Sequence, residues 1–189
     1  MLILGSKLLS TPIMSLQTGG QLGTVEKPVI DPAQLKVLAY EITGPLLDER
    51  PALLLTADIR EYGHLGMIIE SNDEIIGVHD VIKIEAIYDL NFNLIGMPVI
   101  DEQKRKLGKV EDYSLETGSF VIQQLNVKRG LLRSLTDTGL LIHRAQIVEI
   151  NNQAIVVKSN AEKSVAPVMS ALRTDYVNPF RSATPKTEG

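Results

Sequence analysis

Two short stretches decide the fold of this sequence: Leu-Gly-Thr-Val-Glu at residues 22–26 and Leu-Gly-Lys-Val-Glu at residues 107–111. They lie 85 residues apart (107 − 22), and the same shift pairs Val37 with Ile122. Further matches keep the same order along the chain: Tyr40 with Leu125, Ile42 with Val127, Pro12-Ile13 with Pro98-Val99, and Val81–Ile84 with Ile147–Ile150. A series of matches in one order predicts an internal duplication.

Each half divides into short apolar segments separated by residues that favour turns, as β-strands do. The strands expected in the first half cover residues 8–14, 22–30, 35–42, 53–56, 66–69 and 74–76. Those expected in the second half cover residues 98–100, 106–115, 119–127, 139–142, 147–150 and 154–158. Within 119–127 we expect the face of Val121, Leu125 and Val127 to point inward. Short, numerous strands avoid exposed edges most easily by closing into a barrel, so we predict two tandem antiparallel β-barrels.

The predicted organisation is a first barrel with a linker helix over residues 1–90, a second barrel over 91–160 and a tail over 161–189. The linker helix is expected within His79–Asp89, with Asp80 as its cap and Val81, Ile84 and Tyr88 as its apolar stripe. A strand with Ile82, Ile84 and Ala86 on one face is the alternative. The tail is predicted to be partly helical and then disordered, because its last residues are rich in Pro, Ser and Thr.

Composition limits the possible functions. Of the 189 residues, 44% are apolar and 22% charged, and none is cysteine, which excludes disulfides, thiolate nucleophiles and cysteine-ligated metals. This fits a reducing cytoplasm, and no segment has the length of apolar sequence that a membrane span needs. Residues 1–89 carry 6 basic and 13 acidic side chains (−7), and residues 90–189 carry 13 basic and 10 acidic (+3). The second half therefore tolerates a phosphate backbone better than the first.

No motif for catalysis, cofactor binding or metal binding emerges. The three histidines, His64, His79 and His143, have no spacing that puts two ligands on one helix face, and no Gly-x-Ser-x-Gly elbow occurs. Residues 19–23 are rich in glycine but lack the dinucleotide and P-loop patterns, so we interpret them as a turn. We predict that the protein is not an enzyme and uses no cofactor.

Basic residues gather around one predicted hairpin of the second half. They flank its first turn and follow its return strand, and they comprise Lys104, Arg105, Lys106, Lys109, Lys128, Arg129 and Arg133. If the two strands pair, both groups form one basic patch that suits RNA phosphates or an acidic protein surface. Because Asp101, Glu102, Glu111 and Asp112 lie among them, a solvated mixed-charge face is the alternative.

The pattern of an apolar pair, a polar turn, Leu-Gly-Lys-Val-Glu-Asp at 107–112 and an alternating strand at 119–127 resembles the PRC-barrel family. The first half carries the pattern more weakly at 22–26 and 35–42, and the likeness covers residues 5–158. The resemblance implies a mainly β protein with two tandem small antiparallel PRC-like β-barrels, a short linking helix and a flexible C-terminal tail. It also implies an interaction module without catalytic residues.

Known members include the H subunit of photosynthetic reaction centres and ribosome-maturation factors. This chain lacks the membrane helix of the first and the distinct N-terminal barrel of the second, so neither role transfers directly. We expect a cytoplasmic, non-catalytic adaptor or scaffold that binds another protein. An RNA- or ribosome-associated assembly factor using the basic patch is the alternative, and an enzyme comes third. The apolar segment 82–94 is expected either between the two barrels or in a homodimer interface.

Overall fold

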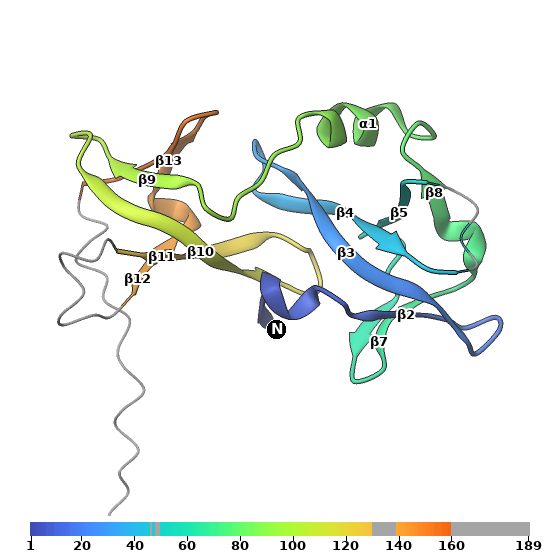
Figure 1. The fold of residues 1–189 in the computed structure, drawn as a ribbon. Helices are drawn as coiled ribbons and strands as arrows, with labels where there is room; N and C mark the ends of the chain where they lie inside the picture. The colour runs from blue at the N-terminus through green and yellow to red at the C-terminus, as the bar shows by residue number, and fades with distance from the viewer. Residues whose placement is uncertain (46, 48–49, 130–138, 160–189) are drawn as a thin grey trace, which may run out of the picture.

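The computed structural model describes residues 1–45, 47, 50–129 and 139–159, and this part of the chain forms two seven-stranded sheets and a single α-helix that lies over the first sheet (Figure 1). The predicted mainly β fold is confirmed. The predicted tail and Arg133 lie outside the described residues. No helix in the described ranges is long and apolar enough to cross a membrane.

The first sheet has the strand order β6-β7-β2-β3-β4-β5-β8. Its strands are β2 (Pro12–Ser15), β3 (Gln21–Asp31), β4 (Lys36–Thr43), β5 (Ala52–Leu55), β6 (Glu61–Gly63), β7 (Gly66–Ile69) and β8 (Ile75–Gly77). A 3-10 turn, η2 (Asn72–Glu74), precedes β8, and helix α1 (Ile82–Asp89) leads from this sheet toward the second.

The second sheet has the order β12-β11-β10-β9-β14-β13, with β1 added to β10. Its strands are β9 (Pro98–Asp101), β10 (Lys106–Glu116), β11 (Ile122–Lys128), β12 (Leu140–His143), β13 (Ile147–Ile150), β14 (Ile155–Val157) and β1 (Leu2–Leu4). Two 3-10 turns, η1 (Gly5–Leu8) and η4 (Arg144–Gln146), follow β1 and β12. The chain thus begins in the second sheet and then builds the first.

The two sheets repeat one arrangement of strands. In both, the long strand (β3 or β10) lies between a short strand that precedes it and the strand that follows it. In both, a later strand pairs in parallel with the short one, as β7 does with β2 and β14 with β9. The stretches at 22–26 and 107–111 occupy the same place on β3 and β10.

The two halves meet through equivalent backbone groups. The Val37 N–H donates to the Phe120 carbonyl at 3.0 Å, and the Ile122 N–H donates to the Leu35 carbonyl at 2.8 Å. Val37 and Ile122 are 85 residues apart, as are Leu35 and Phe120, and a β-bridge joins Lys36 to Val121 between them. The junction therefore has a local two-fold pseudo-symmetry.

The prediction of two closed barrels is not confirmed, because neither sheet closes into a barrel. One continuous hydrophobic core takes buried residues from both halves, including Tyr40 of β4 and Phe120, whose rings meet edge to face with centroids 6.1 Å apart. Each curved sheet thus contributes its apolar face to a shared core. Burial between the halves, and not closure of each sheet on itself, removes these faces from water.

Several local predictions need correction. The linking helix is confirmed as α1, but Val81 occupies its N-cap, and Asp80 instead accepts a hydrogen bond from the Gly77 N–H at 2.7 Å. In β11, Ile122 is fully buried although it was assigned to the outer face, because a register shift opposite Ser114 and Leu115 changes the alternation. The apolar stretch 82–94 is only partly buried, since Ile82 is 84% exposed while Leu94 is fully buried.

Candidate protein-interaction site

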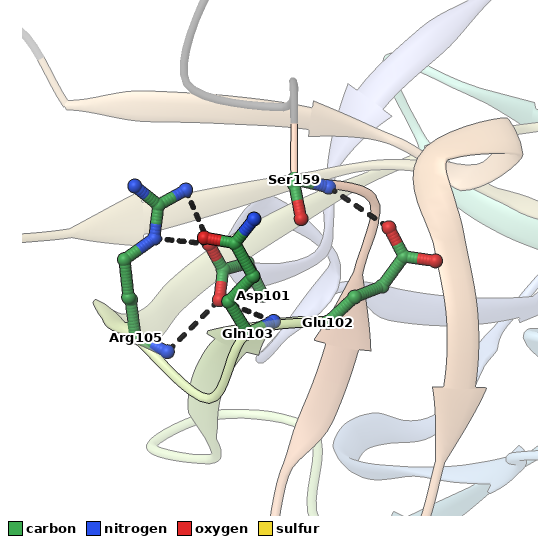
Figure 2. A network of polar contacts seen from close by, with 5 residues as sticks. All are labelled: Asp101, Glu102, Gln103, Arg105 and Ser159. Atoms are coloured by element: carbon green, nitrogen blue, oxygen red, sulfur yellow. Dashed lines mark hydrogen bonds and ion pairs between the residues drawn. The ribbon is translucent and has the colours of Figure 1, made fainter.

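The turn between β9 and β10 is built around one buried carboxylate (Figure 2). Oδ1 of Asp101 accepts hydrogen bonds from the backbone N–H groups of Gln103 and Arg105, both at 2.9 Å. Its Oδ2 accepts from Nε and Nη2 of Arg105, both at 2.6 Å. Burial acts to raise the pKa of Asp101, but the Arg105 and Gln103 hydrogen bonds and the Arg105 charge oppose it and hold the pKa below its ordinary value. The arrangement fixes the shape of the turn that carries the basic residues.

Neighbouring groups connect this turn to the end of β14. A carboxylate oxygen of Glu102 accepts a hydrogen bond from the Ser159 backbone N–H at 3.2 Å, as Figure 2 shows. The Glu102 N–H donates to the Val157 carbonyl at 3.1 Å. These bonds hold the turn against the sheet, so its exposed side chains start from a fixed backbone.

The predicted basic residues have different environments. Arg105 is paired with Asp101 although its side chain is 54% exposed, and Lys104, Lys106, Lys109 and Lys128 are exposed as well. Lys109 lies directly opposite Lys128 in the β10–β11 register, and Lys128 Nζ is 3.2 Å from a Glu111 carboxylate oxygen. Arg129 is partly buried. The structure therefore brings Lys109 and Lys128 together and places Lys104 and Lys106 toward the preceding turn.

A groove at the boundary of the two halves was not predicted from the sequence. One wall is the β3–β4 turn, residues 32–35, and the other is the segment 144–150 with β13, and the cavity volume is about 390 Å³. Nη2 of Arg144 donates to the Gln34 carbonyl at 3.3 Å and joins the walls. We name this site the junction groove. Because it forms only where distant segments meet, no local pattern indicated it.

Strand β13 gives the junction groove an open strand edge. It ends the hydrogen-bonded order of its sheet, so one edge of its backbone pairs with β14 and the other has no strand beside it in the described part of the chain. Val148 in this strand is 53% exposed. An open edge beside exposed apolar surface is the kind of site to which an extended segment of another protein adds.

The histidines lie apart from this groove or serve local structure. His79 is exposed and its Nδ1 lies 2.7 Å from a Glu85 carboxylate oxygen, which raises the pKa of His79. His143 caps η4, where its Nδ1 accepts a hydrogen bond from the Ala145 N–H at 3.2 Å. Across the described ranges, no three His, Cys, Asp or Glu side chains form a group suited to a metal ion.

Comparison with known proteins assigns part of the chain to a family. Residues 87–163 match the family model of the PRC-barrel domain. The match covers β9 to β14 and does not extend over the first sheet. No curated protein matches the chain. The segment from the end of α1 through β14, which builds most of the second sheet, is therefore similar to a PRC-barrel domain.

Proposed function

We propose that this protein is a non-catalytic adaptor of the cytoplasm that binds another protein at the junction groove. One observation carries the proposal: the open edge of β13, with Val148 53% exposed, borders a groove lined by both halves of the chain. A rigid backbone edge supplies hydrogen bonds to an extended partner, and the flanking apolar side chains give it selectivity. The partner is therefore expected to dock as an added strand.

The proposal treats the two halves as tandem copies of one PRC-type module. The same strand order in both sheets and the paired bonds at Val37 and Ile122 support this view. Tandem modules joined through a shared core present one fixed surface, because the groove walls cannot move independently without breaking that core. A fixed groove reduces the conformational entropy lost on binding.

Photo-crosslinking tests the adaptor role. A photoreactive amino acid is placed at Gln34, an exposed residue of one groove wall, and the protein is irradiated in the cells that produce it. We expect a discrete protein adduct that survives nuclease treatment. Val148→Glu should abolish it by placing a charge on the apolar edge, whereas Gln153→Glu, in the exposed turn after β13, should leave it unchanged. An adduct that is insensitive to Val148→Glu would contradict docking at this groove.

A second candidate function, RNA or ribosome binding, is favoured by the exposed lysines. Lys109 and Lys128 lie directly opposite each other on β10 and β11, and only Lys128 is paired with Glu111, so the two exposed lysines present positive charge that suits a phosphate backbone. The triple variant Lys104→Glu, Lys106→Glu, Lys109→Glu should abolish RNA binding and leave unfolding unchanged. RNA binding that decreases steeply with salt and disappears in this variant would move this function ahead of the adaptor role.

A further inference from the structure

The first eight residues precede the strands of the first sheet in the chain, but they pack against the second sheet. This N-terminal arm, Met1–Leu8, comprises β1 and η1, and it runs beside β10 (Figure 1). Leu2, Ile3 and Leu4 pair in antiparallel register with Glu116, Leu115 and Ser114. The Thr117 N–H also donates to the Met1 carbonyl at 3.0 Å. The arm thus completes a sheet of the PRC-barrel domain from outside the matched segment.

The surface of β10 recognises the arm residue by residue. Gly5 lies against the ring of Tyr113, where an added Cβ would come within 2.4 Å of a ring carbon, so only glycine fits without displacement of the ring. The next residue, Ser6, donates its N–H to Oδ1 of Asp112 at 3.2 Å and its hydroxyl to Oδ2 at 2.5 Å. Leu8 is 1% exposed. These are the features of a peptide ligand: a short strand, a small residue at a flat contact, a polar contact and an apolar anchor.

The 85-residue internal repeat relates the arm to a second segment, which packs on the first half of the chain. A shift of 85 residues takes Leu2–Leu4 to residues 87–89 at the end of α1, and takes Asp112 back to Lys27 of β3. Tyr88 of α1 does lie at Lys27, with the ammonium 5.1 Å from the ring centroid. The segment that precedes each half therefore packs on the long strand of the other half. The arm thus joins the second sheet from the part of the chain that precedes the first sheet.

We propose that the arm groove, formed by residues 112–116 of β10, is a peptide-docking site, and that its partner in trans is the arm of a second copy of this chain. An identical arm offers every contact that the chain's own arm makes. Exchange requires only that the short connection at Leu9 and Ser10 opens. In that connection Leu9 is 45% exposed and Ser10 has a φ of 60°. Two chains that exchange arms form a closed dimer and leave no arm groove empty.

A peptide experiment tests the groove. In the full-length variant Gly5→Val, the new side chain collides with Tyr113 and displaces the chain's own arm. A fluorescent peptide of residues 1–10 should bind this variant. The same peptide carrying Gly5→Val should bind at least tenfold more weakly, and the wild-type chain should take up the native peptide more slowly because its own arm competes. Equal binding of both peptides, or binding of neither, would contradict the proposal that the arm groove is a peptide-docking site.

A disulfide trap tests the second copy and uses chains that keep Gly5. The sequence contains no cysteine, so the single variants Ser6→Cys and Asp112→Cys each carry one thiol. Mixed at high concentration under oxidation, they should form a covalent heterodimer, while the double variant should close within one chain only at low concentration. A control mixture of Ser6→Cys with Glu111→Cys should form markedly less heterodimer. Peptide binding without a trapped heterodimer would support the arm groove as a docking site and contradict the arm of a second copy as its partner.

Discussion

At Gly108 the backbone of β10 lies against the Lys128 carbonyl at the end of β11. An added Cβ there would be 2.2 Å from the Lys128 carbonyl oxygen, and its φ is 156°. Gly23, 85 residues earlier, has the same contact with the Thr43 carbonyl oxygen at 2.5 Å, and Thr43 and Lys128 are themselves 85 residues apart. In each of the two stretches that decide the fold, a neighbouring backbone therefore lies so close to the glycine that no side chain fits there.

Gly108→Ala is expected to destabilise the protein by on the order of 2 kcal/mol, because the strand must move or adopt strain. Gly23→Ala should cost a similar amount for the same reason. Gly118→Ala is the matched control, since nothing lies within 4 Å of its added Cβ. Urea unfolding measures the free energy of unfolding of the three variants. Equal stability of all three would show that the close backbone contact does not make glycine necessary for stability.

Asp101 gives a pH-dependent prediction. Its pKa is lower in the folded protein than in the unfolded chain, where an aspartate titrates near about 3.9. The charged carboxylate thus stabilises the fold above that pH, and the contribution is lost as pH falls through the lower folded-state pKa. Asp101→Asn should lower the melting temperature at pH 7, and its difference from wild type should shrink below pH 4. A difference that stays constant with pH would assign the effect to packing alone.

At the scale of elements, α1 is attached to the first sheet by a small polar group. The Tyr88 hydroxyl donates to a Glu41 carboxylate oxygen at 2.8 Å, and Lys27 Nζ lies 2.8 Å from the same oxygen. Burial and the Glu41 hydrogen bond raise the pKa of Tyr88, so the hydroxyl stays protonated and donates at neutral pH. This group holds the helix over β3 and β4.

Tyr88→Phe should therefore destabilise the protein by about 1.5–3 kcal/mol, the usual net contribution of a hydrogen bond to a charged group. Hydrogen exchange of the α1 amides should accelerate more than that of β10. Ile82→Ala, at a residue that is 84% exposed, serves as a control within the same helix and should change stability little. Unchanged α1 exchange in Tyr88→Phe would show that apolar packing alone holds the helix.

Sequence patterns predicted the elements whose signals are local. The expected strands at 66–69 and 147–150 coincide with β7 and β13, because apolar runs between turn residues mark both ends. The three-residue strands β1 and β6 were missed, whereas β8 and β14, which are equally short, were expected at 74–76 and 154–158. Pairing of β1 with β10 joins residues more than a hundred positions apart, which no local pattern encodes. Likewise, the basic residues were visible in the sequence, but the junction groove depends on tertiary contacts between distant segments.

At the scale of the whole molecule, the two halves form one packed structure. They share a core, exchange their leading segments and are joined by backbone hydrogen bonds at Val37 and Ile122. In such an arrangement, loss of one half exposes apolar surface and unpaired backbone groups of the other. The halves are therefore expected to unfold in one cooperative step and not as independent domains.

Phe120→Ala tests this cooperativity at the junction. Phe120 is 4% exposed and meets Tyr40 from the other half, so its truncation should cost about 3–5 kcal/mol. Native-state hydrogen exchange should show that amides of β3 and β10 lose protection by the same amount, because both exchange through the same global opening. Leu16→Ala, at an exposed residue, should alter neither strand. If β10 alone loses protection, the halves fold separately, and the arm then remains as a link between two independent domains.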